Sequence, residues 1–235
     1  MNLFYTTDIQ DGLLLLPEEE ARHCIQVLRH KTGDIIHIVD GQGGLYKAEI
    51  VEANKKRCAA RQLEAWPEYG RRPFYLHLAI APTKNIARME WLVEKATEAG
   101  VDEVTPLLCE RSERRQLRSD RLEKIVLAAM KQSLKAYLPR LNELTPLPAF
   151  LNQQAGRQQA NYIAYLGEGQ KGHLKDNIRA GESVCILIGP EGDFSEAEVQ
   201  ACREAGFVPV SLGSSRLRTE TAGLAACFIA NLINE

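Results

Sequence analysis

The sequence lacks any long run of apolar residues. The longest run near its start covers only residues 13–16, whereas a membrane-spanning helix needs about 20 such residues. No basic residue precedes an apolar run within residues 1–12, so this segment does not resemble a secretory signal. We therefore expect a soluble, cytoplasmic protein with no membrane partner.

The sequence also lacks the cysteine and histidine spacings of a metal site. Six cysteines are scattered along the chain, and no two of them are two to four residues apart. His23 and Cys24 are adjacent and could not chelate one ion from a regular element. Scattered thiols of this kind are typical of small buried hydrophobic residues in a reducing compartment. We therefore expect no bound metal and no disulfide.

Net charge is almost absent, because 29 Lys and Arg stand against 31 Asp and Glu. Taken alone, this balance argues against a nucleic-acid partner, since phosphates are met by basic surfaces. The charges are unevenly distributed, however: residues 111–140 contain nine Lys and Arg but only three Asp and Glu. A charged helix is often merely a solvated face. The alternative is that this stretch gathers positive charge on one side of the molecule and contacts RNA.

Residues 1–70 are rich in short β-prone runs. Strands are predicted for three of these segments, residues 35–39, 45–51 and 57–63. Residues 40–44, Asp-Gly-Gln-Gly-Gly, have the composition of a hairpin turn. One helix is predicted over residues 17–29, where three early glutamates suit a helix N-terminus. Together these elements predict a small β-barrel-like domain, followed by a linker over residues 66–73.

After this linker, helical and β-prone segments alternate. Strands are predicted at residues 74–80, 103–108, 161–166, 184–188 and 208–212. Helices are predicted at residues 86–99, 120–137, 195–205 and 221–233. This alternation predicts an α/β domain over residues 71–235 with a mostly parallel sheet. Ligands of such sheets bind beyond the carboxyl ends of the strands, so the loops that follow the strands are the candidate site.

The first of these loops is rich in glycine. It runs Gly167-Glu168-Gly169-Gln170-Lys171-Gly172 and matches the dinucleotide-binding pattern G-x-G-x-x-G, with the acidic Glu191 about twenty positions later. The segment that follows, residues 173–179, is short and polar where a crossover helix should be apolar. We therefore favour a glycine-rich turn and keep a nicotinamide-dependent oxidoreductase as an alternative.

A second loop, residues 188–194, reads Ile-Gly-Pro-Glu-Gly-Asp-Phe. Its two glycines flank Pro-Glu at the end of a strand, which would let backbone groups approach a ligand closely. A tight strand-to-helix turn explains the same pattern equally well. Ser195 and Glu198 then match a capping box, which predicts where the next helix begins.

A third loop, residues 212–222, carries Arg216 and Arg218 just before a predicted helix. Thr219 or Thr221 would serve as the N-cap. The two arginines exceed what capping needs, because cations are unfavourable at a helix N-terminus. We therefore predict an anionic partner for them. The small residues 222–226 would permit close packing on another element or on a cofactor.

Together, the second and third loops resemble those of the RsmE family, SPOUT-class enzymes that methylate N3 of a uridine in small-subunit ribosomal RNA. The resemblance covers nearly the whole chain, with spaced motifs in the same order. These motifs are His23-x-x-x-Val27-Leu28-Arg29, Gly33-Asp34, Asp40-Gly41, Lys84, Arg88-x-Glu90, residues 94–101, Arg111-Ser112, Gln132-Ser133, Gly189-Pro190-Glu191-Gly192 and Leu217-Arg218-Thr219-Glu220-Thr221-Ala222. The departures are Leu134-Lys135 for Gly-Arg, Asp193 for a glycine and Ser215-Arg216 for Arg-Ile.

The resemblance implies a PUA-like RNA-binding domain over residues 1–70 and a SPOUT methyltransferase domain over residues 71–235. The second domain would contain a deep trefoil knot, a rare topology, and would form a homodimer with the partner near each site. S-adenosylmethionine would be held in the knot by Leu166, Gly167, Ile188, Gly189, Pro190, Gly192, Leu212, Gly213, Leu217, Thr221 and Ala222. The 16S ribosomal RNA would be contacted by Arg22, Arg29, Lys84, Arg88, Arg111, Arg114, Arg115, Lys131, Gln132 and Arg216.

The implied reaction sets chemical requirements. The nucleophile must lie in line with the sulfonium methyl group. Uracil N3 must first lose its proton, and a cation placed near the two carbonyl oxygens would stabilise the resulting anion. We assign this catalytic role to Arg218, and Glu191 is a candidate base whose side chain could equally have a purely structural role. The target base must be unstacked or flipped. A non-catalytic RNA-binding or ribosome-assembly protein on the same fold is the main alternative.

Overall fold

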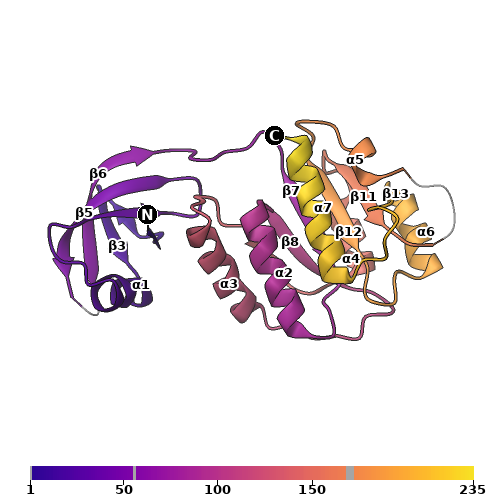
Figure 1. Ribbon diagram of the computed structural model, residues 1–235, viewed down its shortest axis with the longest axis horizontal. Helices are drawn as coiled ribbons and strands as arrows, with labels where there is room; N and C mark the ends of the chain where they lie inside the picture. The colour runs from indigo at the N-terminus through magenta and orange to yellow at the C-terminus, as the bar shows by residue number, and fades with distance from the viewer. Residues whose placement is uncertain (1, 55–56, 168–171) are drawn as a thin grey trace. The chain divides into compact units, whose positions relative to one another are not determined.

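The computed structural model describes residues 2–54, 57–167 and 172–235, and the chain divides into two compact units (Figure 1). The small unit contains the N-terminal segment up to Arg71 together with Leu127–Leu138. The large unit contains Arg72–Val126 and Pro139–Glu235. In these ranges no helix combines the length and the apolar character needed to cross a membrane.

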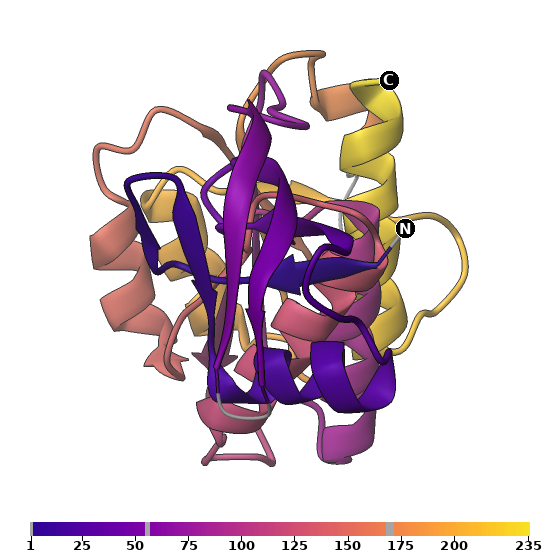
Figure 2. The ribbon, with the colours of Figure 1, turned by 90° about the vertical axis from the view of Figure 1, so that its left-hand side faces the viewer.

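The small unit is built around one six-stranded sheet in the order β1-β4-β5-β6-β3-β2 (Figure 2). Its strands are β1 (Leu3–Tyr5), β2 (Ile9–Gln10), β3 (Leu13–Leu16), β4 (Ile35–Val39), β5 (Leu45–Ala53) and β6 (Cys58–Trp66). Buried and less buried side chains alternate along β3, so one face of that strand contributes to the core. The predicted small β domain is confirmed, but β6 continues to Trp66, into the segment predicted as linker.

The predicted helix over residues 17–29 forms in two parts, the α-helix α1 (Glu18–Arg22) and the π-helix η1 (His23–Val27). Three glutamates occupy the first turn of α1, as the sequence pattern predicts. Ala21 and Cys24 are buried in the same apolar cluster as Phe4 and Ile38. The helix therefore covers the sheet of its own unit.

Residues 127–138 complete the small unit, although the sequence does not suggest it. Met130 and Ala136 pack in one apolar cluster with Leu3, Val39 and Leu45. The ammonium of Lys131 also forms an ion pair with the carboxylate of Glu20. A second hydrophobic cluster of this unit therefore depends on a segment far along the chain.

The helix predicted over residues 120–137 is shorter in the structure, where α3 covers Ser119–Gln132. Leu134 takes a left-handed backbone conformation, with φ at 57°. The chain then bonds to the hairpin turn: the Gly43 N–H donates to the Ala136 carbonyl at 3.0 Å, and the Leu138 N–H donates to the Gly41 carbonyl at 2.9 Å. These tertiary hydrogen bonds replace the last helical turn.

The large unit contains a seven-stranded sheet in the order β10-β8-β7-β12-β11-β13, with β9 also paired to β8. Its strands are β7 (Leu76–Ile80), β8 (Glu103–Leu108), β9 (Arg140–Leu141), β10 (Thr145–Pro146), β11 (Ala160–Ala164), β12 (Val184–Ile188) and β13 (Val208–Val210). Each of these pairings is parallel. The central strands β7 and β12 are buried along their whole length, as expected when both faces are covered. The predicted α/β domain is confirmed.

Helices cover this sheet on both faces. They are α2 (Ile86–Ala99), α4 (Leu147–Gln154), α5 (Leu174–Asn177), α6 (Glu196–Glu204) and α7 (Thr219–Ile233), whereas α3 is divided between the two units. Helices α2 and α7 lie side by side (Figure 1). A Cβ atom on Gly223 of α7 would lie 2.7 Å from the Ile80 side chain and 3.2 Å from the Leu92 side chain. The small residues at the start of α7 therefore do permit close packing on β7 and α2, as predicted.

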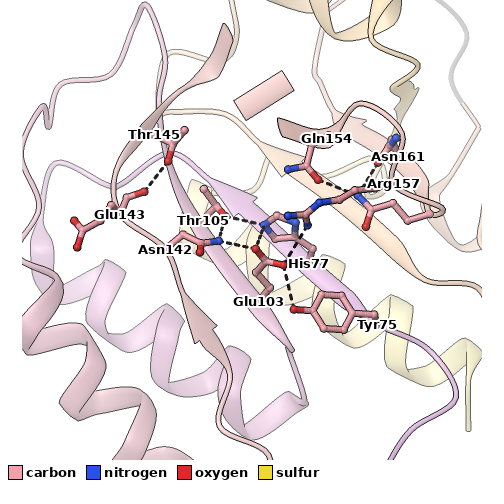
Figure 3. A network of polar contacts seen from close by, with 11 residues as sticks. Tyr75, His77, Glu103, Thr105, Asn142, Glu143, Thr145, Gln154, Arg157 and Asn161 are labelled. Atoms are coloured by element: carbon pink, nitrogen blue, oxygen red, sulfur yellow. Dashed lines mark hydrogen bonds and ion pairs between the residues drawn. The ribbon is translucent and has the colours of Figure 1, made fainter. Parts of the chain in front are cut away.

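The amino ends of β7 and β8 carry a polar network (Figure 3). Its members are Tyr75, His77, Glu103, Thr105, Asn142 and Arg157. The Asn142 amide donates to Glu103 Oε1 at 2.6 Å, the Tyr75 hydroxyl donates to Glu103 Oε2 at 3.1 Å, and Arg157 pairs with the same carboxylate at 3.3 Å. Burial lowers the pKa of His77 to about 4, so its ring is neutral at pH 7. The network was not predicted, and its groups largely satisfy one another.

The six cysteines are all buried, which confirms the interpretation of them as small hydrophobic residues. Burial raises the pKa of the Cys202 and Cys227 thiols to about 12. Within the part of the chain that the structure describes, no cluster of three or more His, Cys, Asp or Glu side chains could hold a metal ion. Burial of this kind is typical of structural cysteines.

Candidate functional site

Three loops at the carboxyl ends of β11, β12 and β13 line a single pocket of about 840 Å³. The lining consists of residues 164–167, 188–193 and 210–219, together with Ala222. This is the edge of the sheet where a ligand is expected, and the volume suits a nucleotide-sized molecule. The three glycine-containing loops singled out in the sequence therefore meet at one place.

The first loop leaves β11 at Tyr165 and reaches Gly167. A Cβ atom on Gly167 would lie 1.9 Å from the Tyr165 hydroxyl oxygen, so a side chain there would collide with that ring. Residues 168–171, the middle of the G-x-G-x-x-G match, lie outside the described residues. Helix α5, which follows, has only four residues. That length does not provide the crossover helix of a dinucleotide-binding unit.

The second loop is a tight turn that is held by several hydrogen bonds. The Asp193 N–H donates to the Pro190 carbonyl at 2.9 Å and closes the turn. Arg111 donates from Nη1 to the Gly192 carbonyl at 2.9 Å and to the Phe194 carbonyl at 3.4 Å. A Cβ on Gly189 would lie 3.0 Å from the Phe194 ring, so this glycine lets Phe194 fold back against the turn.

Glu191 lines the pocket and also connects two loops. Its Oε1 accepts the backbone N–H of Lys84 at 2.9 Å. Arg114 donates to the carbonyls of Thr83 at 3.0 Å and of Lys84 at 2.6 Å. Glu191 therefore has a structural contact of its own, while its role as a base stays a prediction.

The capping box at the start of α6 is confirmed. The Ser195 hydroxyl accepts the Glu198 N–H at 3.3 Å, and the Glu198 carboxylate accepts the Ser195 N–H at 2.9 Å. Satisfying these two donors fixes where the second loop ends and α6 begins.

The third loop leads directly into α7. Gly213 has φ at 124°, a conformation that residues with a side chain rarely adopt. Arg218 is the N-cap residue of α7 and makes no side-chain capping bond, so the prediction of Thr219 or Thr221 as N-cap is wrong. The first backbone N–H groups of α7 therefore have no side-chain cap, and they add positive potential beside the pocket.

Two arginines of this loop, Arg216 and Arg218, are exposed and line the pocket. Neither side chain forms a hydrogen bond or ion pair with any residue in the described ranges. Two unpaired guanidinium groups next to an uncapped helix N-terminus favour an anionic ligand or a negatively charged transition state.

The pocket contains nearly all of the residues predicted to hold the cofactor. These are Leu166, Gly167, Ile188, Gly189, Pro190, Gly192, Leu212, Gly213, Leu217 and Ala222. Thr221 is exposed on the first turn of α7 and does not line the pocket. Sequence reasoning missed several lining residues, among them Ala164, Tyr165, Asp193 and Ser211. They adjoin the predicted segments, so widening each motif by a few positions would have found them.

The basic residues predicted to contact RNA in the small unit fall into two groups. Arg22 and Arg29 are exposed, and neither side chain is paired with a described residue. Arg29 also has a left-handed backbone, with φ at 61°. Lys131 is instead engaged with Glu20, whose side chain is only 10% exposed, and Gln132 is exposed. The structure thus leaves Arg22 and Arg29 available for a ligand, whereas Lys131 has a structural partner.

Most of the predicted RNA contacts in the large unit have partners within the chain. Lys84 pairs with Glu113 at 2.7 Å, and Arg88 lies 3.6 Å from the Glu220 carboxylate. Arg111 and Arg114 bind loop carbonyls, as described above. Arg115, by contrast, is exposed and has no side-chain partner among the described residues. The leading RNA-contact candidates of this unit are therefore Arg115 and Arg216.

Comparison with family models identifies two matching domains. Residues 71–231 match the RNA methyltransferase domain, and residues 16–63 match the RNA methyltransferase PUA domain. The ribosomal RNA small subunit methyltransferase E of Bacillus subtilis is 28% identical over 220 residues, covering 88% of this chain and 85% of that protein. The enzyme of the same name from Aquifex aeolicus is 29% identical over 227 residues, covering 94% and 95%.

Solved structures agree with this assignment. A probable rRNA-methyltransferase from Porphyromonas gingivalis is 43% identical with a TM-score of 0.91, over 100% of this chain and 98% of that one. The ribosomal RNA small subunit methyltransferase E of Neisseria gonorrhoeae is 28% identical with a TM-score of 0.88, over 100% of this chain and 98% of that one. It was solved bound to S-adenosyl methionine. The chain therefore belongs to the RsmE family of small-subunit ribosomal RNA methyltransferases.

Proposed function

We propose that this protein transfers the methyl group of S-adenosylmethionine to N3 of one uridine in the 16S ribosomal RNA of the small subunit. One observation carries the proposal: the two motif loops at residues 188–193 and 212–222 form a single pocket in a chain of the RsmE family. A relative with the same fold over the whole chain binds S-adenosyl methionine.

The pocket fits this cofactor. Apolar side chains for an adenine ring are present in Leu166, Ile188, Leu212 and Leu217, and the glycines expose backbone donors and acceptors. When bound, S-adenosylmethionine supplies a methyl group on a sulfonium. The chain's task is to hold that group, exclude water and present the target base in line with it.

Arg218 is the proposed catalytic residue. It lines the pocket, is exposed and has no acidic partner in the described ranges, so its positive charge is free to act on a ligand. A guanidinium beside the uracil carbonyl oxygens would stabilise the N3 anion as it attacks. Arg216, two residues earlier, would hold a phosphate of the RNA. Glu191 is the candidate that accepts the N3 proton.

The RNA would be bound by both units, each through exposed arginines. In the small unit these are Arg22 and Arg29, which flank the π-helix, and in the large unit Arg115 and Arg216. The near-neutral net charge permits this mode of binding, because RNA would be contacted by these few arginines and not by a uniformly basic surface. Since ribosomal RNA is the substrate, we propose that the protein acts in the cytoplasm.

A homodimer completes the proposal. Large apolar side chains are exposed on α2 and α7: Trp91 at 43%, Phe228 at 49% and Leu232 at 63%. These two helices pack on each other, so the three side chains belong to one layer of the fold. A second copy of the chain would cover them. Because the first turn of α7 lines the pocket through Thr219 and Ala222, that partner would lie near the site.

We also infer the trefoil knot expected of the family. Strand β12 lies between β7 and β11, and β13 lies at the outer edge of β11. From β13 the chain returns to α7, which packs against β7, β12 and α2. The three pocket loops are the segments that would cross one another in this path.

The decisive experiment uses small subunits from cells that lack this activity. They are incubated with the protein and S-adenosylmethionine carrying a labelled methyl group, and the modified nucleoside is identified by mass spectrometry. One labelled 3-methyluridine per subunit is the expected product. Cofactor binding without any methyl transfer would favour the non-catalytic assembly protein. Binding of a nicotinamide cofactor in place of S-adenosylmethionine would favour the oxidoreductase.

A further inference from the structure

We propose that Asp193 is a positioning residue that fastens the first pocket loop to the second and so holds the methyl-donor pocket ready for its ligand. The proposal rests on the proposed function, because it assumes that the pocket binds S-adenosylmethionine. It concerns an aspartate at a turn position whose backbone conformation favours glycine.

The first argument is the backbone of Asp193. Its φ is 62°, a left-handed conformation in which glycine is strongly favoured over residues that carry a Cβ. Aspartate tolerates this conformation better than most residues but still less well than glycine. A glycine would therefore form the same turn with less strain. The presence of an aspartate indicates that its side chain makes a compensating contact.

The side chain makes two such contacts. Asp193 Oδ2 accepts the backbone N–H of Leu166 at 3.0 Å, and Oδ1 accepts the N–H of Phe194 at 2.8 Å. The first bond joins residues 27 positions apart, on two different loops of the pocket. Both are charge-assisted bonds to a carboxylate, the stronger class of hydrogen bond in proteins.

The Asp193–Leu166 bond completes the support of the second loop. Arg111 fastens that loop through the Gly192 carbonyl, and Glu191 fastens it to Lys84. These two contacts connect the loop to residues that precede β11, whereas Asp193 connects it to the loop that follows β11. Leu166 lines the pocket, so fixing its backbone fixes part of the wall. A wall that is ordered before binding reduces the ordering cost of binding.

The test compares variants of Asp193 by calorimetry with S-adenosylmethionine. Asp193→Gly keeps the turn but removes the bond to Leu166, and we expect the cofactor Kd to rise by about tenfold. Asp193→Asn retains one acceptor oxygen, so we expect partial rescue, with a rise of about threefold. In steady-state assays of Asp193→Gly, KM for S-adenosylmethionine should rise while kcat changes little.

Asp11→Gly is the matched control. Asp11 is also an aspartate with a left-handed backbone, at a φ of 49°, but it belongs to the small unit and does not line the pocket. Its replacement relieves the same kind of strain and should leave the cofactor Kd unchanged. A change in Kd common to both variants would point to backbone strain, not to the Leu166 contact.

Hydrogen exchange separates this proposal from the proposed function. In the ligand-free protein, the Leu166 amide should exchange faster in Asp193→Gly than in the wild type. If wild-type protein fails to bind S-adenosylmethionine, the proposed function fails, yet this exchange difference still reports on the contact. Wild-type cofactor affinity in Asp193→Gly, together with unchanged exchange at Leu166, would overturn the assignment.

Discussion

The two ends of the parallel sheet in the large unit use polar residues in opposite ways. At the carboxyl end, Arg216 and Arg218 are exposed, line a pocket and have no side-chain partner among the described residues. At the amino end, Glu103 is 3% exposed and is bound by Tyr75, Asn142 and Arg157. Polar groups that satisfy one another stabilise a fold, whereas groups left unsatisfied at a concave surface are available to a ligand.

A strongly displaced pKa is found at the amino end of the sheet. The group with a pKa displaced to about 4 is His77, at the structural end of the sheet. Its shift arises mainly from burial, and His77 does not line the pocket at the carboxyl end of the sheet. A displaced pKa identifies a candidate functional residue only when the group also faces a cavity.

Removing the centre of the amino-end network should have the largest effect. In Glu103→Ala, Tyr75, Asn142 and Arg157 lose their common acceptor, and we expect the free energy of unfolding to fall by about 3–5 kcal/mol. Urea denaturation measures this loss. Glu103→Gln, which keeps an acceptor oxygen, should lose less. The folded fraction of either variant should bind S-adenosylmethionine with wild-type affinity. Weakened binding would contradict the view that the amino end of the sheet is structural and the carboxyl end binds the ligand.

At the opposite end, Arg218→Ala should lower the methylation rate by about 100-fold or more, the usual cost of removing a group that stabilises transition-state charge. Its unfolding free energy and its cofactor Kd should match those of the wild type. Arg218→Lys keeps the positive charge but lacks the planar guanidinium group with its paired N–H donors, so it should recover part of the rate. Wild-type turnover by Arg218→Ala would refute the catalytic role.

Acidification should affect the amino end through His77. The folded-state pKa of about 4 lies below the value of about 6.5 expected in the unfolded chain, so the unfolded state binds the proton first. The stabilisation from a neutral His77 is therefore fully present above about pH 6.5 and is lost as the pH falls. We expect a loss of about 2 kcal/mol between pH 7 and pH 5.

Urea denaturation across that pH range measures this slope, and His77→Gln provides the control. Its free energy of unfolding should be lower at pH 7 but should change less with pH, since the titrating group is gone. An equal slope in the two proteins would assign the pH dependence to other groups.

The smallest effect is expected at Gly192. A Cβ at this position would meet the Arg111 side chain at an ordinary distance of 3.4 Å, so the fold itself should accept a side chain. The larger Gly192→Val side chain should press on Arg111, which holds this loop through the Gly192 carbonyl, and so shift the pocket wall and raise the cofactor Kd by about tenfold, with little change in unfolding free energy. Gly181 lies outside the pocket lining, but Gly181→Val would be a poor control because the backbone φ of 80° at this position would add strain to any residue with a side chain. Gly192→Ala is the better comparison, and calorimetry should place it between the wild type and the valine variant.

Local patterns predicted much of this fold. The alternation of helices and strands and the capping box at Ser195 depend on residues close together in sequence, and the structure confirms them. The amino-end network could not be predicted in the same way. His77 and Glu103 become neighbours only through the register of β7 on β8, and Arg157 joins them from after α4. The contact between Asp193 and Leu166 likewise exists only once two loops meet at one pocket.

The participation of residues 127–138 in the small unit has a consequence for synthesis of the protein. A nascent chain that has emerged only as far as the linker lacks Met130 and Ala136, so the apolar surfaces of Leu3, Val39 and Leu45 lack the segment that covers them. The small unit can acquire its second cluster only after the first strands and helices of the large unit have left the ribosome. We therefore expect the folding of this chain to depart from the usual order in which an N-terminal domain is finished first. For the same reason, a fragment expressed up to Arg71 is not equivalent to the small unit.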